Sequence, residues 1–176
     1  MAVGKAPPLS VKVIAAHVSG YLHLTTDTLA PWDLPREAYD SKRHQYNAAH
    51  LLKAFESKPL DTCGKVIAVF DVDIFVPIFT HVFGEAMLGG KVALVSLYRL
   101  GKAEGSNTPE FSTVLERAAK IALHELGHLF NVMHCTDERC LMRFAGNLDD
   151  LDRIPFQFCR YCTTFLEDAT HAPAFP

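Results

Sequence analysis

Long hydrophobic runs are absent from this sequence, and so is an excess of positive charge. The longest stretch without Asp, Glu, Lys or Arg covers residues 13–26, shorter than the roughly 20 apolar residues that a membrane-spanning helix needs. Lys and Arg total 17 against 20 Asp and Glu, a net charge of −3, which argues against a general nucleic-acid binder. No signal segment with a small-residue cleavage site follows the first ten residues. We therefore expect a cytoplasmic protein that binds neither membrane nor nucleic acid.

Cysteine is scarce, with 5 in 176 residues, and its distribution is uneven. A chain of this length suits one domain that can bury its own core without disulfides. Cys63 stands alone, and we expect it to be a small buried residue. The other four fall within residues 135–162. Because cytosolic proteins rarely form disulfides, such a cluster is more typical of a metal site.

Hydrophobic patterning predicts an α/β (α+β) domain. Short apolar segments rich in β-branched residues and bounded by turn residues indicate strands. The predicted strands cover residues 11–18, 65–70, 81–86 and 91–97. The second lacks alternation, so we expect it to be buried on both faces.

Two helices are predicted from capping signals and helical spacing. The first begins at Asp40 or Ser41 and runs to about Ser57. The second begins at residues 108–110 (Thr-Pro-Glu), after a polar loop at residues 101–108, with proline at its first position and an acid in its first turn. After residue 134 we expect loops and short helical turns, held together by something other than a large core.

The second helix carries His124-Glu125-Leu126-Gly127-His128, an H-E-x-x-H motif. Histidines four residues apart lie on one helix face, where both imidazoles can bind one zinc ion. Glu125 points about 100° around the helix, so it flanks the metal and can act as general base and acid toward a zinc-activated water. An amphipathic helix containing two histidines by chance is the plainer alternative.

A third ligand requires the chain to turn sharply after the helix. In H-E-x-x-H-x-x-G-x-x-H proteins a glycine makes this turn in the left-handed conformation. Here Asn131 occupies that position, and asparagine is the next most tolerant residue for a left-handed cap. His134 then stands where the third ligand is needed; the alternative is a partly buried core histidine.

A second set of candidate ligands follows directly. The spacing C-x4-C and then C-x2-C is typical of a closed, structural four-cysteine zinc site, whose binding energy becomes folding energy. Two disulfides, a redox C-x-x-C pair and a zinc ribbon that binds nucleic acid are the alternatives; the flanks carry no basic patch. The four candidate ligands are Cys135, Cys140, Cys159 and Cys162.

The combined pattern of histidines and cysteines, with Met142 two residues after Cys140, resembles the archaemetzincins, a branch of the metzincin zinc metalloproteases. Softer support comes from upstream segments within residues 70–77, 82–86 and 95–100. The resemblance implies a twisted mixed sheet packed on helices, with the zinc helix at the floor of a cleft. It also implies that residues 91–97 form the upper edge of the cleft, where an extended peptide could add as a strand.

The resemblance further implies that Met142 forms the Met-turn beneath the three histidines. Some metzincins carry a tyrosine two residues later that approaches the metal; Phe144 stands there, so we expect no such ligand.

Acidic residues near predicted strand ends could line the cleft, but we favour turns for them. These residues are Asp71, Asp73 and Glu85.

The sequence therefore predicts a zinc-dependent peptidase with two zinc ions per chain, one catalytic and one structural. We expect one metalloprotease domain over residues 1–176, with the active-site helix in residues 1–130 and the third histidine, Met-turn and cysteines in residues 131–176. Its partner is a peptide or protein substrate, and we expect a monomer. A degenerate, non-proteolytic zinc-binding protein is the rival interpretation, and Asn131 is its best argument.

Overall fold

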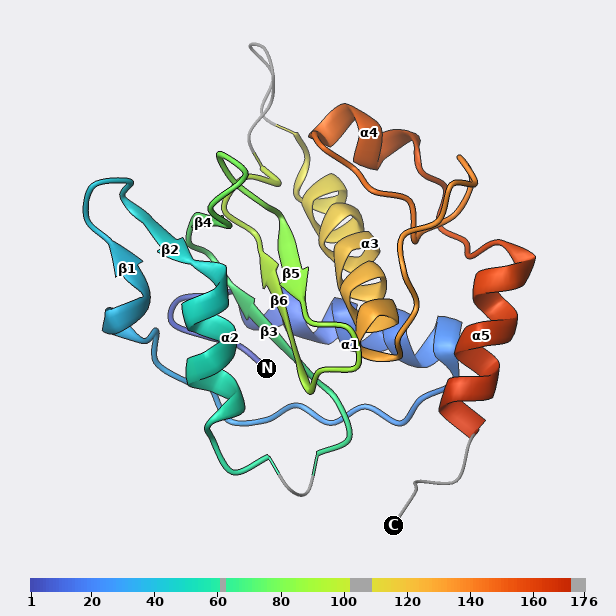
Figure 1. The fold of residues 1–176 in the computed structure, drawn as a ribbon, viewed down its shortest axis with the longest axis horizontal. Coiled ribbons are helices and arrows are strands. Elements are labelled where there is room, and N and C mark those ends of the chain that lie inside the picture. The colour runs from blue at the N-terminus through green and yellow to red at the C-terminus, as the bar shows by residue number, and fades with distance from the viewer. Residues whose placement is uncertain (61–62, 102–108, 172–176) are drawn as a thin grey trace.

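The computed structural model describes residues 1–60, 63–101 and 109–171. Its main sheet has the order β3-β6-β5, formed by Val66–Phe70, Val92–Ser96 and Gly84–Ala86 (Figure 1). Strands β3 and β6 are parallel, whereas β5 pairs antiparallel with β6. The mixed sheet packed on helices confirms the predicted fold class.

Strand β6 separates two hydrophobic cores. Its alternate residues Val92 and Leu94 belong to the core beneath helix α2, Ala48–Glu56. Ala93 and Val95 belong to the core formed with helices α1 (Pro8–Leu22) and α3 (Phe111–Leu129). Because both faces of β3 and β6 are covered, their sequences are continuous apolar runs and do not alternate between apolar and polar residues. The prediction that residues 65–70 are buried on both faces is confirmed.

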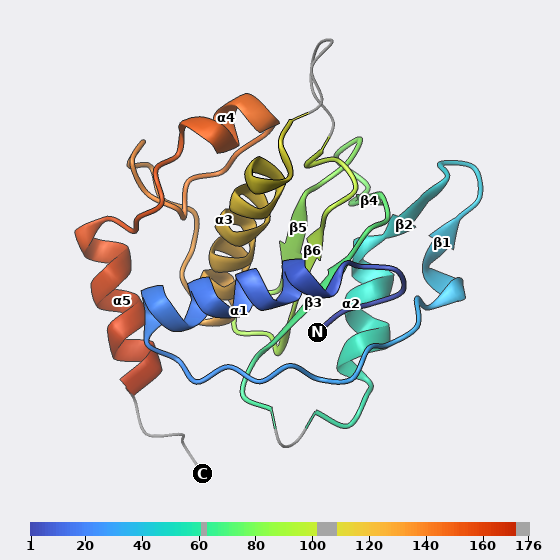
Figure 2. The same cartoon turned by 180° about the vertical axis from the view of Figure 1, so that it is seen from behind.

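The predicted strand at residues 11–18 is wrong, because this segment is part of helix α1, Pro8–Leu22. Proline occupies the first helical position, where its missing N–H costs nothing. The buried residues Val11, Ile14, Val18 and Leu22 recur at helical spacing and face α3, which α1 crosses (Figure 2). The apolar residues of the segment VKVIAAHV fit the two-residue period of a strand as well as the roughly 3.6-residue period of a helix. Packing against α3 selects the helix.

The predicted helix start at residue 40 or 41 is also wrong. The 3-10 turn η1, Arg36–Ala38, leads into β1, Tyr39–Asp40, which pairs antiparallel with β2, Gln45–Asn47. Asp40 accepts hydrogen bonds from the backbone N–H groups of residues 42 and 43, so it caps a turn and not a helix. Asn47 caps α2 by accepting from the N–H of His50 at 3.2 Å. Strand β4, Ile74–Phe75, was not predicted and extends β2 in a second small sheet.

Helix α3, Phe111–Leu129, carries the H-E-x-x-H motif as predicted. It begins later than expected: Glu110 is the N-cap, Pro109 precedes it, and the first turn holds no acid. The expected cap Thr108 and most of the expected loop at 101–108 lie outside the described residues. Two further helices follow, α4 (Leu148–Arg153) and α5 (Arg160–His171). The latter is longer than the short helical turns predicted there.

Strand β6 is not the edge of the cleft, contrary to the prediction for residues 91–97. It lies between β3 and β5 and all of its residues are buried. The terminal strand β5, which was predicted as part of residues 81–86, borders α3 instead.

Within the described part of the chain, no helix is long and apolar enough to cross a bilayer.

The two-core arrangement predicts that Leu94→Ala is strongly destabilising. Leu94 is 0% exposed, and removing a buried leucine side chain costs about 2–5 kcal/mol. Urea unfolding of the zinc-loaded protein measures the change, with Leu9→Ala, at a side chain 51% exposed, as the matched control. A Leu94→Ala protein that unfolds within about 0.5 kcal/mol of wild type would contradict the assignment of β6 as the central strand.

Candidate functional site

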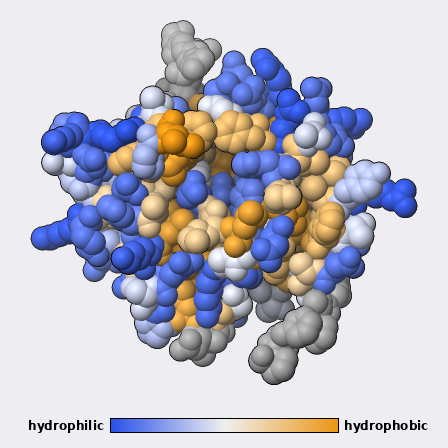
Figure 3. All heavy atoms as spheres, in the orientation of Figure 1, coloured by the Kyte–Doolittle hydropathy of each residue, from blue (hydrophilic) through white to orange (hydrophobic). Residues whose placement is uncertain are grey.

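A cleft of about 680 Å³ runs between β5, α3 and the chain that follows α3. Figure 3 shows this face, on which hydrophobic residues border a hollow near the middle. His124, Glu125, His128 and His134 all line the cleft. Residues predicted from the motif are therefore gathered at one site, even though His134 lies beyond the end of the helix.

The three histidines point nitrogen atoms at one position. Their possible ligand atoms all lie within 4.8 Å of one another, and the Nε2 atoms of His124 and His128 are 3.1 Å apart. Two nitrogens bound about 2.0–2.1 Å from a tetrahedral zinc lie roughly 3.3 Å apart. The spacing of the side chains therefore fits a zinc ion.

The backbone fixes which nitrogen of each ring faces the site. The Nδ1 atom of His124 lies 2.7 Å from the carbonyl oxygen of Leu141, and that of His128 lies 2.8 Å from the carbonyl oxygen of Val132. A carbonyl only accepts, so each Nδ1 carries the proton and each Nε2 presents a lone pair. Two lone pairs 3.1 Å apart repel each other unless a cation lies between them, which makes this donor set suited to a metal.

Burial keeps the imidazoles neutral. It lowers the pKa of His124 to about 3, against a smaller opposing effect of the Leu141 carbonyl. Burial also lowers the pKa of His128 and that of His134. Zinc binds the neutral ring, so the site holds its ligands in the form that the metal requires across the physiological pH range.

Asn131 makes the turn that returns the chain to the site. Its φ is 64°, the left-handed conformation expected for this position. The Asn131 N–H donates to the carbonyl of His128 at 2.9 Å, and the Val132 N–H donates to that of Gly127 at 3.0 Å. This pair of bonds is a Schellman motif. Asparagine thus replaces the usual glycine without loss of the helix-ending hydrogen bonds.

Glu125 lies beside the histidines, against strand β5. Its side chain is 8% exposed, and a Cβ added to Gly84 would lie 2.6 Å from its Oε1. Glycine at residue 84 therefore leaves the space that the carboxyl group occupies. Burial raises the pKa of Glu125, and the nearby Glu85 raises it further. A cation next to this carboxyl group would favour its ionised form.

Met142 is fully buried beneath α3. A Cβ at Gly127, between the two helical histidines, would collide with its sulfur atom. The glycine in the motif thus allows the methionine to pack directly under the site. Phe144 offers no ligand atom; its ring meets the His134 ring edge-on at 5.5 Å and lines the cleft.

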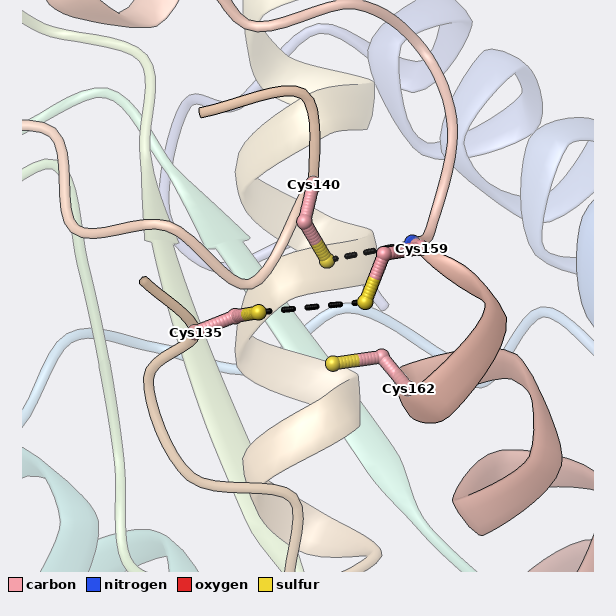
Figure 4. A group of neighbouring side chains, drawn as sticks. All are labelled: Cys135, Cys140, Cys159 and Cys162. Carbon is pink, nitrogen blue, oxygen red and sulfur yellow. Dashed lines mark hydrogen bonds between the residues drawn. The ribbon is translucent and has the colours of Figure 1, made fainter. Parts of the chain in front are cut away.

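The four cysteines form a second cluster. Their sulfur atoms all lie within 4.8 Å of one another, and Figure 4 shows them converging from the loop after α3 and from the start of α5. None of the four forms a disulfide bond. The Cys135 and Cys159 sulfurs are 3.8 Å apart, close to the roughly 3.8 Å expected for thiolates about 2.3 Å from a tetrahedral zinc.

Backbone N–H groups support these sulfurs as they would support thiolates. The N–H of Cys159 donates to Cys140 Sγ at 3.3 Å, and that of Asp137 donates to Cys135 Sγ at 3.4 Å. Such donors orient the ligands and stabilise negative charge. With four free thiols in this arrangement, the disulfide alternative is disfavoured and a closed metal site is favoured.

The two clusters share one loop. Cys135 directly follows His134, and its N–H donates to the carbonyl of Met142 at 2.8 Å. The carbonyl of the neighbouring residue Leu141 accepts a hydrogen bond from Nδ1 of His124. The Leu141 N–H donates to the carbonyl of Gln157 at 2.8 Å. Residues 135–142 therefore connect the cysteine cluster to two of the three histidines.

Sequence reasoning missed several residues of the site. Glu85 lines the cleft, although a turn role was favoured for it, and Gly84 makes room for Glu125. Asp73 instead pairs with Arg99 at 2.5 Å, and Asp71 lies away from the cleft. A carboxylate on a strand next to a glycine was the only available signal. The backbone carbonyls that orient the histidines leave no sequence signal.

Residues 10–168 match the model of Peptidase family M54. The archaemetzincin of Methanopyrus kandleri is 36% identical over 166 residues, covering 93% of this chain and 91% of that protein. The archaemetzincin of Pyrococcus horikoshii is 37% identical over 131 residues, covering 74% and 70%.

Solved structures agree. The crystal structure of the Methanopyrus kandleri archaemetzincin has a TM-score of 0.83 at 34% identity, covering 96% of this chain and 93% of that one. A zinc-dependent peptidase from Methanocorpusculum labreanum has a TM-score of 0.82 at 26% identity, covering 94% and 98%. The resemblance to archaemetzincins is confirmed: this chain belongs to peptidase family M54 and is a zinc metalloprotease.

Proposed function

We propose that this peptidase cleaves peptide bonds in the cleft beside α3, with His124, His128 and His134 holding a catalytic zinc. The observation that carries the assignment is the pair of Nε2 atoms 3.1 Å apart, both made lone-pair donors by backbone carbonyls. When bound there, zinc would lower the pKa of a water molecule and polarise the scissile carbonyl.

Glu125 is the residue we assign to proton transfer. Its carboxyl group lies next to the ligand histidines and is held against Gly84, where it can accept a proton from the attacking water and deliver it to the leaving amine. The buried surroundings that raise its pKa suit a group that must both take up and release a proton. Asp73 forms an ion pair with Arg99, so we do not assign it to proton transfer.

We propose that an extended peptide binds along β5. This strand ends its sheet, and its residues line the cleft, so main-chain hydrogen bonds could add the substrate as a further strand. Exposed hydrophobic side chains at the rim offer contacts for substrate side chains. They include Phe79, Leu88, Met133 and Phe144.

We propose that the cysteine cluster holds a structural zinc and that residues 1–176 act as one domain. The part before residue 131 supplies two histidines and Glu125, whereas residues 131–176 supply the third histidine and all four cysteines. Neither part contains a complete catalytic site. A monomer in the cytoplasm that binds a peptide or protein, and no nucleic acid, remains our prediction.

Glu125→Gln should lower kcat/KM on a cleavable peptide by about 10²–10⁴-fold, the usual contribution of a general base. The amide keeps the shape of the side chain but cannot accept the proton. A fluorogenic peptide library screened with zinc-loaded protein measures the rate, and metal analysis should still find two zinc ions per chain. The control Glu37→Gln changes an exposed acid outside the cleft and should retain the rate. Undiminished hydrolysis by metal-verified Glu125→Gln protein would refute this assignment.

Cys159→Ala should weaken the catalytic zinc as well as the structural one. Loss of a thiolate loosens Cys135 and the adjoining His134, and altered support of a ligand typically costs about 10–100-fold in metal affinity. Competition with a chromogenic chelator measures the affinity of each site. Cys63→Ala removes the cysteine outside the cluster and should keep both affinities. A Cys159→Ala protein with the wild-type stability and catalytic-zinc affinity would show that the two centres are independent.

A further inference from the structure

Lys120 places a positive charge in the wall of the catalytic cleft. It lies on α3 one turn before His124, so both residues are on the same helix face. The residue is only 4% exposed, yet it lines the cleft together with the zinc ligands. A lysine is rarely buried this far unless it has a partner or a function.

The ammonium group of Lys120 has few partners inside the protein. Glu116 Oε1 lies 2.9 Å from its Nζ, and the carbonyl oxygen of Leu151 lies at 3.5 Å. An ammonium group has three donors, so the longer contact leaves its capacity incompletely used. The Glu116 side chain is 56% exposed, and an ion pair with such an exposed group is weakened by solvent.

The neighbouring charges do not supply the missing partner. The acid Asp152 lies near this lysine, but both of its oxygens accept hydrogen bonds from the guanidinium of Arg117, at 2.8 and 2.6 Å. Asp152 is therefore already paired with a different cation.

Apolar side chains make up much of the lining of the cleft, which also includes Glu85 and Glu125. A carboxylate entering the cleft would lose water, so its attraction to the Lys120 ammonium group would be stronger than at the surface. Arg143 is the other cation lining the cleft, but its side chain is 40% exposed and lies near Glu138. The apolar wall residues are Phe83, Ile121, Leu141, Leu151 and Ile154.

We propose that Lys120 is a specificity-determining residue that binds a carboxylate group of the peptide substrate, either an Asp or Glu side chain next to the scissile bond or the peptide's C-terminus. The inference rests on the proposed peptidase function of the cleft. It makes Lys120 part of substrate recognition and not of the chemical step, since Glu125, the residue assigned to proton transfer, lies five residues further along α3.

The test measures binding apart from catalysis. Zinc-loaded Glu125→Gln protein, which should bind peptides without cleaving them, is titrated calorimetrically with C-terminally amidated peptides that carry one Glu or one Gln at each position. A third set, carrying Gln and a free C-terminus, distinguishes the two sources of carboxylate. We expect a carboxylate peptide to bind about tenfold more tightly than its amide counterpart, the effect of one hydrogen bond between charged groups.

Variants at Lys120 test whether the preference for carboxylate peptides depends on this residue. Lys120→Met in the same background should remove the carboxylate preference, and Lys120→Glu should reverse it toward peptides with Lys at the same position. Arg143→Met, the matched control at the other cation, should keep it. Urea unfolding and zinc content establish that each variant is folded and loaded. A preference that survives Lys120→Met, or no preference at any position, would overturn the proposal.

Cleavage assays separate this proposal from the peptidase assignment. If wild-type protein cleaves Glu and Gln peptides at equal rates, the peptidase function stands and the role of Lys120 fails. If no peptide is cleaved but the binding preference depends on Lys120, the carboxylate site stands and the proposed catalysis fails.

Discussion

Two imidazole nitrogens that face each other 3.1 Å apart, with lone pairs on both, form the interaction on which this site depends. The arrangement is unfavourable without a cation, yet the fold enforces it through two backbone carbonyls and through burial of the rings. A metal would turn this repulsion into binding energy. The donor set is thus arranged in advance for a metal ion such as zinc.

The loop after α3 connects the histidine cluster to the cysteine cluster. Asn131 ends the helix, His134 and Cys135 follow within four residues, and the loop returns through Leu141 to support His124. The C-terminal part packs Leu141, Met142, Leu151, Ile154 and Leu166 into the core that it shares with α1 and α3, and the cysteine cluster joins the loop to α5. We therefore regard the four thiols as an added support for the loop that carries the third histidine, beside the packing of Met142 in the core.

Much of the site could be predicted from sequence, because ligand residues at fixed spacing on a helix or in adjacent pairs are local features. Elements whose conformation depends on distant contacts could not. Residues 11–18 fit a strand and a helix equally well, and only packing against α3 selects the helix. The order β3-β6-β5, which makes β5 the cleft edge, depends on a crossover that no local pattern specifies. The carbonyls of Leu141 and Val132 belong to the backbone, which any sequence provides.

One cleft holds the three histidines, the carboxyl group that we assign to proton transfer, and the buried lysine that we propose selects the substrate. The central claim is that the two clusters are separate zinc sites. Metal analysis of purified His128→Ala protein beside wild type tests it most directly. The account predicts two zinc ions per wild-type chain and one in the variant. One zinc in the wild type, or two retained in the variant, would contradict it.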